Sequence, residues 1–160
     1  MQGVELRTAR AEDARAIHGL IAELAEFEKL THLLDATEAS LRDALEGDQP
    51  RVECLVAERA GEIVAYALFF HNYSTFLGRR GLYLEDLYVS PKARRAGIAK
   101  ALLRRLAALA IERQCGRFEW TVLDWNTSAI AFYEGLGATI LPEWRVVRLA
   151  GDALDTFAAQ

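Results

Sequence analysis

The sequence predicts an α/β or α+β fold in which helices flank a partly antiparallel, partly parallel sheet. Two observations indicate this class. Short β-rich runs and amphipathic helical runs alternate along the chain, and hydrophobic residues make up 52% of it, which is enough to bury a core. A length of 160 residues without an internal repeat or a linker suits one domain, so residues 1–160 are expected to fold as a single unit.

The first fifty residues are expected to form one strand and two helices. The short run Val4 to Thr8 has strand character. From Asp13 to Glu28, apolar residues recur at helical spacing and predict an amphipathic helix with Asp13 near its start. A second helix is expected from Thr37 to Glu46, since Thr37 is a suitable N-cap, and Pro50 closes the segment.

The next thirty residues are expected to form a hairpin followed by a long loop. Two β-rich runs, 52–58 and 62–70, are separated by Arg59-Ala60-Gly61, a turn composition that predicts a β-hairpin. The stretch 71–81 is polar and aromatic and contains Phe76. Its length suits the rim of a substrate site better than a simple connector.

The second half continues the alternation of strands and helices. A strand is expected over 82–89, and the apolar stripe after residue 97 predicts a helix that runs to Glu112. A short helix is expected from Asn126 to Leu136. Two further strands are expected, over 118–123 and 143–149.

Composition excludes several classes of protein. A net charge of -4 disfavours a general nucleic-acid binder, which needs a basic face for the phosphates. The two cysteines, Cys54 and Cys115, lie far apart and outside any CxxC or Cys/His cluster, so we expect buried thiols and neither a disulfide framework nor a metal site. Because the sequence shows no signal peptide and no run long enough to span a bilayer, we expect a cytoplasmic protein that binds no membrane.

The most informative stretch is Arg94-Arg95-Ala96-Gly97-Ile98-Ala99, which lies between a predicted strand and a predicted helix. The first turn of a helix leaves backbone N–H groups without partners and carries partial positive charge, so it favours an anion such as a pyrophosphate. Gly97 and Ala99 keep the backbone accessible, and the arginines add charge, as do Lys92 and the pair Arg79 and Arg80, which are expected nearby. Such loops also occur in α/β proteins for ordinary packing reasons.

Two adjacent carboxylates, Glu85 and Asp86, interrupt the apolar strand 82–89. Side chains alternate between the faces of a strand, so the two should point in opposite directions unless a β-bulge re-aims one of them. Burying a carboxylate is costly without a partner, water or a functional cleft, and we interpret the pair as functional. Farther on, Asn126 can cap the predicted helix, and Tyr133 is either a catalytic group or an ordinary packed aromatic.

Together these segments resemble the GNAT superfamily of N-acetyltransferases over nearly the whole chain, and within it the branch of spermidine/spermine (diamine) and thialysine acetyltransferases. Two strings are the most specific for this resemblance, Leu82-Tyr83-Leu84-Glu85-Asp86 and the run from Trp125-Asn126 to Phe132-Tyr133. The other matching residues are Glu23-Leu24-Ala25, Glu28, Arg94, Gly97, Ile98, Ala99, Ala129-Ile130, Gly137-Ala138 and Trp144-Arg145.

The resemblance implies the GNAT fold, with a mixed, mostly antiparallel sheet, and direct transfer of an acetyl group from acetyl-CoA to a primary amine. It implies that Glu85 removes the amine proton, directly or through water, and that Tyr133 protonates the leaving thiolate. The implied acetyl-CoA contacts are Leu87, Val89, Arg94, Arg95, Ala96, Gly97, Ile98, Ala99, Asn126, Ala129 and Tyr133. The implied contacts with a cationic acceptor are Glu28, Asp86, Phe27 and Phe76.

Phe27 and Phe76 stand where the polyamine branch tends to have tyrosine and tryptophan, so a shorter amine such as thialysine is a further candidate acceptor. Relatives in this branch commonly form homodimers, and the strand expected over 143–149 could contribute to such an interface. Two alternatives stay open: acetylation of a protein or peptide amine, which the long 71–81 loop would hinder, and a CoA-binding regulatory module with little catalysis.

Overall fold

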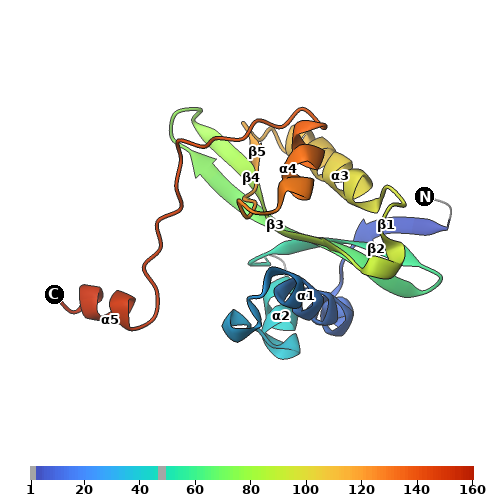
Figure 1. Ribbon diagram of the computed structural model, residues 1–160, viewed down its shortest axis with the longest axis horizontal. Coiled ribbons are helices and arrows are strands. Elements are labelled where there is room, and N and C mark those ends of the chain that lie inside the picture. The colour runs from blue at the N-terminus through green and yellow to red at the C-terminus, as the bar shows by residue number, and fades with distance from the viewer. Residues whose placement is uncertain (1–2, 47–49) are drawn as a thin grey trace. The chain divides into compact units, whose positions relative to one another are not determined.

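The computed structural model describes residues 3–46 and 50–160. The chain divides between Thr121 and Val122 into two units, and each is described by itself. The first unit holds the whole sheet, the two helices that follow β1, and the helix that follows β4 (Figure 1).

The sheet of the first unit has five strands in the order β1-β2-β3-β4-β5. The first four pair antiparallel with their neighbours, and β5 pairs parallel with β4, which confirms the predicted mixed and mostly antiparallel sheet. The strands are β1 (Val4–Thr8), β2 (Glu53–Arg59), β3 (Glu62–Ser74), β4 (Arg79–Val89) and β5 (Phe118–Glu119).

Helices cover both faces of the sheet (Figure 1). On one face, Ile17 and Leu20 of the helix α1 pack with Tyr66 and Leu68 of β3 in a buried core that also includes Leu41 of α2. The long helix α3 covers the opposite face (Figure 1). The α-helices are α1 (Ala14–Glu28), α2 (Glu38–Leu45) and α3 (Ile98–Glu112), and single 3₁₀ turns are η1 (Ala11–Asp13), η2 (Thr31–Leu33) and η3 (Pro91–Ala93).

Local signals account for the boundaries of several elements. The side chain of Thr37 accepts a hydrogen bond from the Ser40 amide at 3.1 Å, so it is the predicted N-cap of α2. The β2–β3 turn has Ala60 at φ 52° and Gly61 at φ 80°. Two positive φ angles are the requirement of the tight hairpin turn whose twist matches the flanking strands, so the predicted hairpin is confirmed.

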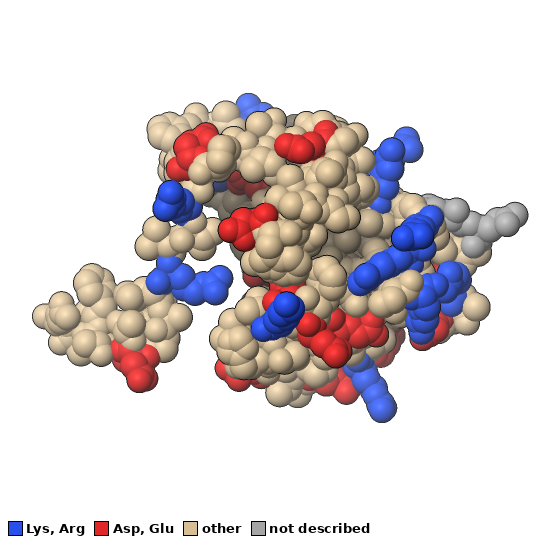
Figure 2. Space-filling model, in the orientation of Figure 1, with Lys and Arg blue, Asp and Glu red and all other residues tan. Residues whose placement is uncertain are grey.

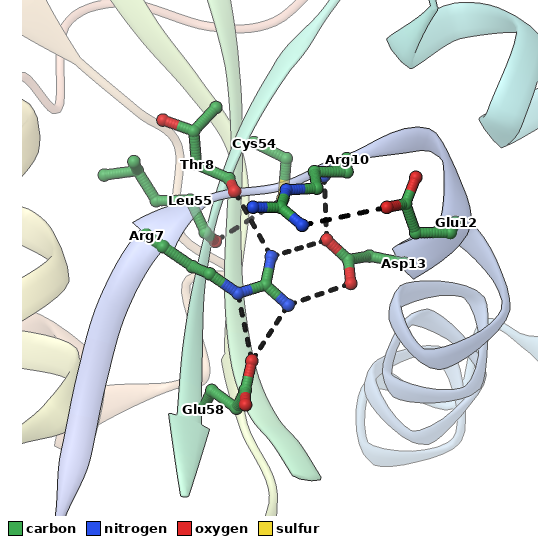
Figure 3. Close-up of polar contacts among 8 residues, drawn as sticks. All are labelled: Arg7, Thr8, Arg10, Glu12, Asp13, Cys54, Leu55 and Glu58. Atoms are coloured by element: carbon green, nitrogen blue, oxygen red, sulfur yellow. Dashed lines mark hydrogen bonds and ion pairs between the residues drawn. The ribbon is translucent and has the colours of Figure 1, made fainter. Parts of the chain in front are cut away.

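An ion-pair network attaches the start of α1 to the sheet (Figure 3). The Arg7 guanidinium donates to both oxygens of Asp13, at 2.7 and 2.9 Å, and to Glu58 at 2.9 Å. Asp13 also accepts from the Arg10 amide at 2.7 Å. The guanidinium holds the pKa of Asp13 below its usual range, more than offsetting the opposite effect of burial. The sequence placed Asp13 at the helix start but did not indicate this network.

Three predictions in the first unit need correction. The segment 71–81 is no long loop, because β3 extends to Ser74, β4 begins at Arg79 and only residues 75–78 form the turn. The strand expected over 118–123 is limited to Phe118–Glu119. Arg79 lies at the opposite end of β4 from Val89, about 30 Å along the strand, so Arg79 and Arg80 are remote from the loop that precedes α3.

The second unit contains α4 (Thr127–Glu134) and α5 (Asp152–Ala158). The prediction of α4 is confirmed, and its N-cap is Asn126, whose side-chain oxygen accepts from the Ala129 amide at 3.3 Å. The strand predicted over 143–149 was wrong, since this segment has neither strand nor helix structure, and α5 was not predicted. The apolar side chains of the segment 143–149 are exposed, and Val147 is 94% exposed.

Cys54 is buried, Cys115 is partly buried, and both are free thiols. Across residues 3–46 and 50–160, no helix has the length and apolar character to cross a membrane. Within the same residues, no three His, Cys, Asp or Glu side chains gather as a metal ion would require.

Candidate active site

A β-bulge in β4 lies at the predicted carboxylate pair. Phe69 of β3 lies opposite Leu84, and Leu68 lies opposite Asp86, so Glu85 has no residue opposite it. Such a bulge bends the strand and changes the direction of its side chains, and bulges are frequent beside active sites. Glu85 is exposed, whereas Asp86 is partly buried. The structure therefore has the bulge that the sequence left open.

Asp86 and Glu28 form an acidic cluster on the α1 face of the sheet. Asp86 lies opposite Leu68, which belongs to the core beneath α1, and Glu28 is the last residue of α1. Burial, followed by the charges of Glu85 and Glu28, raises the pKa of Asp86 to about 6. Burial also raises the pKa of Glu28. A bound cation would stabilise the ionised carboxylates of this cluster, because its charge offsets both the cost of burying them and the repulsion between them.

Aromatic rings and one arginine lie beside this cluster. The Arg94 guanidinium carbon is 5.5 Å from the ring centre of Phe27 and 5.4 Å from that of Tyr88, both cation–π distances. Tyr88 follows Asp86 by two residues and so faces the same side of the strand, a periodicity that could have identified it from the sequence. Phe76 is 97% exposed in the turn at the far end of the β3–β4 hairpin, about 20 Å along the strand from Asp86. The structure thus brings Phe27 near the acidic cluster and leaves Phe76 apart from it.

The predicted anion loop has the backbone geometry that an anion needs. Arg95 and Gly97 adopt positive φ angles of 62° and 77° before α3 begins at Ile98. The Ala101 amide bonds to the Gly97 carbonyl at 3.0 Å, so the amides of 98–100 precede the first bond of the helix and point out of its N-terminus. In Figure 2, Lys and Arg side chains gather on the side where β4 leads into this loop. The loop 94–99 and the free amides at the start of α3 fit a pyrophosphate group.

Arg94 itself has a different place from the one its motif predicts. Its Nε donates to the Val89 carbonyl at 3.0 Å, and its guanidinium lies over the Phe27 and Tyr88 rings. This side chain therefore links the end of β4 to the rim of the acidic cluster.

The second half of β4 presents a free backbone edge. Among residues 3–46 and 50–160, β5 pairs with β4 only at Leu82 and Tyr83, and no other strand of these residues lies beside the edge beyond them. The Ser90 amide bonds to Val64 on the β3 side, and the backbone groups of successive strand residues point to alternate edges. The backbone N–H and C=O groups of Val89 and Leu87 therefore point to the free edge. This edge suits an extended ligand with amide groups, as was expected for these two residues.

The remaining predicted residues lie in the second unit, on α4. Asn126 caps the helix, and Ala129 donates its amide to that cap. The rings of Tyr133 and Phe132 are 5.5 Å apart. The predicted role of Asn126 as a helix cap is confirmed.

Comparison with known proteins identifies the family of the chain and its relatives. Residues 15–138 match the model of the acetyltransferase (GNAT) family. A thialysine N-epsilon-acetyltransferase of Mus musculus is 39% identical, and the alignment covers 100% of both chains. An L-ornithine N5-acetyltransferase of Arabidopsis thaliana is 34% identical over 93% of this chain and 85% of its own.

Solved structures agree with this match in fold. An integron cassette protein from the mobile metagenome of V. cholerae has a TM-score of 0.83 and 25% identity, with both chains covered in full. A ribosomal-protein-alanine N-acetyltransferase of Brucella melitensis has a TM-score of 0.74 over 91% of this chain and 98% of its own, at 24% identity. At that identity the second likeness is one of fold alone.

Proposed function

This chain belongs to the GNAT family of acetyltransferases, and on that premise we propose that it transfers an acetyl group from acetyl-CoA to the primary amine of a small cationic acceptor. The observation that carries the proposal is the acidic cluster of Asp86 and Glu28 in the same unit as the anion loop 94–99. One end of the site suits a cation and the other suits a pyrophosphate. The relatives that act on thialysine and ornithine support the same class of acceptor.

The cofactor end of the proposed site consists mainly of backbone groups. The amides at the start of α3 would hold the pyrophosphate, with charge from Arg95. The backbone groups of Leu87 and Val89 would pair with the pantetheine arm along the free edge of β4. For this pairing, the Val89 carbonyl would share or release its bond from Arg94. Asn126 and Ala129 of α4 complete the set of proposed contacts.

The proposed chemistry needs three proton transfers, two from the nitrogen and one to the thiolate. Acetyl-CoA, when bound, supplies the acetyl group as a thioester. Glu85 would take the proton of the ammonium group, directly or through a water, because an ammonium nitrogen has no lone pair with which to attack. The neutral amine would then bond to the acetyl carbon as the C–S bond breaks, and Tyr133 would give its proton to the thiolate. The nitrogen, cationic after it bonds, would lose its second proton to water, which restores the Tyr133 hydroxyl. An N–H on the free edge of β4 would stabilise the negative charge on the acetyl oxygen.

The acidic cluster supports a short acceptor. Its residues Asp86 and Glu28 lie together on the α1 face, while Phe76, which the resemblance placed at the acceptor, lies at the far hairpin turn. A compact cluster suits one ammonium group at a time, as in thialysine, ornithine or a short diamine. A long loop over 71–81 was expected to hinder a peptide acceptor, but the turn consists of residues 75–78 alone and is too short to do so. The preference for small amines therefore depends on the cluster and on the relatives.

We also propose that the chain forms a homodimer through the segment 143–149. Trp144 is 74% and Val147 is 94% exposed, and Val146 and Leu149 are exposed with them. Several exposed apolar side chains within one short segment are typical of a protein–protein interface, and a second copy of this chain is the partner we propose. A monomeric mass in solution at micromolar concentration would contradict this. The free thiols of Cys54 and Cys115 suit the reducing cytoplasm, which is the location we propose.

The test is acetyl-CoA-dependent release of CoA with thialysine, ornithine, lysine, putrescine, spermidine, spermine and a basic peptide. Turnover of a small amine, with none of the peptide, supports the proposal. Saturable acetyl-CoA binding without turnover of any acceptor would instead indicate a CoA-binding module. The Tyr133→Phe variant should keep its acetyl-CoA affinity and lose about 10- to 1000-fold in turnover, the range of typical acid catalysis. Equal turnover would remove Tyr133 from the mechanism.

A further inference from the structure

The hydroxyl of Tyr66 is buried in the core between the sheet and α1. The side chain is 0% exposed, and its hydroxyl is one of two buried side-chain polar atoms that have no hydrogen-bond partner among residues 3–46 and 50–160. A buried hydroxyl without a partner is unfavourable, and phenylalanine would fill the same space without that cost. The hydroxyl therefore requires an explanation beyond packing.

Tyr66 lies beside the acidic cluster of the proposed site. It pairs with Tyr88 across the β3–β4 ladder, and the next residue on that face, Leu68, pairs with Asp86. Tyr66 and Asp86 are thus diagonal neighbours on one face, at a separation of about 7–8 Å that a long side chain can bridge. Burial raises the pKa of Tyr66, and the charges of Asp86, Cys54 and Glu28 raise it further, so the hydroxyl keeps its proton.

A protonated phenol and a carboxylate are complementary. Asp86 is partly buried, and the nearby charges that act on it, Glu85 and Glu28, are both negative. A neutral hydrogen-bond donor can stabilise the ionised Asp86 carboxylate and still leave its negative charge available to the cationic amine substrate. Tyr66 is such a donor on the opposite strand.

We propose that Tyr66 is a positioning residue for Asp86: its O–H, which has no partner in the arrangement of the structure, donates to the ionised carboxylate once a side-chain rotation brings the two groups together, and it holds that carboxylate toward the ammonium group of the acceptor. The inference rests on the proposed function, in which Asp86 attracts that cation. It assigns a role to a core residue that touches neither substrate nor acetyl-CoA. It also explains why the core keeps a hydroxyl where phenylalanine would pack equally well.

The test is Tyr66→Phe, with Tyr73→Phe as the matched control. Tyr73 lies on the same strand, but its ring is 62% exposed, so its variant removes the same atom from water. In Tyr66→Phe, kcat/KM for the amine should fall roughly 10- to 100-fold, the loss expected for a hydrogen bond to a charged group, while KM for acetyl-CoA stays unchanged. Its melting temperature at neutral pH should stay the same or fall, because the ionised carboxylate loses a donor. Tyr73→Phe should match the parent in every measurement.

Two measurements separate this role from a purely structural one. If Tyr66 acts through Asp86, then Tyr66→Phe should have no further effect on amine kinetics in the Asp86→Asn background, a non-additive double-mutant cycle. NMR titration of the Asp86 carboxyl should show a higher pKa in Tyr66→Phe than in the parent, because the ionised form loses a donor. An unchanged Asp86 titration, or additive effects in the cycle, overturns the inference. A parent protein that acetylates no amine contradicts the proposed function instead, and the titration still decides the role of Tyr66.

Discussion

Replacing Asp86 by asparagine should stabilise the folded protein at neutral pH. In the arrangement of the structure, burial, followed by the charges of Glu85 and Glu28, raises the pKa of Asp86 from 3.8 to about 6. Below pH 3.8 the group is protonated in both the folded and the unfolded state, so it has no effect. Between these pH values the unfolded chain ionises first, and stability falls as the pH rises. A difference of about two pKa units corresponds to about 3 kcal/mol, all of which is present above pH 7.

The assay is urea unfolding of the parent and Asp86→Asn at pH 4.5 and pH 7.5. Asparagine does not titrate, so the stability of the variant relative to the parent should increase by about 2 kcal/mol between these two conditions. Whatever its amide costs in the core affects both conditions equally and does not change this difference. A hydrogen bond from Tyr66 to the ionised carboxylate would reduce this increase of about 2 kcal/mol when Asp86→Asn is made in the parent. The whole increase should then appear when Asp86→Asn is made in Tyr66→Phe.

The control for this experiment is Asp35→Asn, the same change at an exposed position. It should alter stability by less than about 0.5 kcal/mol at either pH. Parallel stability curves for Asp86→Asn and the parent between pH 4.5 and 7.5 would refute the reasoning, because they would show that Asp86 ionises in the folded state as it does in water. The gain in stability should come with loss of amine acetylation, as expected where a site keeps an unfavourable charge for function.

Two further predictions concern the scaffold. Asp13→Asn should lower the free energy of unfolding by about 1–3 kcal/mol at pH 7, because the bidentate partner of Arg7 is lost. Since the pKa of Asp13 is lowered in the folded state, that difference should shrink in urea titrations as the pH falls toward and below 3.8. Gly81→Ala should destabilise by about 1–3 kcal/mol, because the new methyl group would lie 2.3 Å from Asn72 Oδ1. In the helical control Gly19→Ala the methyl group meets no atom within 4 Å, so thermal unfolding should show no loss and a small gain.

Predictions based on neighbouring residues were confirmed where a local signal decides the structure. Thr37 caps α2, and the sequence Ala60-Gly61 forms the hairpin turn, because the hydrogen bonds and φ angles involved lie within a few residues. Gly97 of the anion loop was expected only to keep the backbone accessible, and it also adopts a positive φ angle, which glycine tolerates without strain. The strands were less predictable. Arg79 and Arg80 have the composition of a loop, yet they extend β4 because Tyr73 and Ser74 of β3 pair with them.

The sequence by itself determined the class of fold, the order of the first nine predicted elements, the anion loop, and the carboxylate pair of β4, since each depends on periodicity or composition within a short window. Only the tertiary structure decided that a bulge isolates Glu85, that Asp86 lies near Glu28, and that Arg94 lies over Phe27 and Tyr88. It also decided that segment 143–149 forms no strand. The physical reason is that register, burial and charge depend on which distant residues meet, and a local pattern does not specify them.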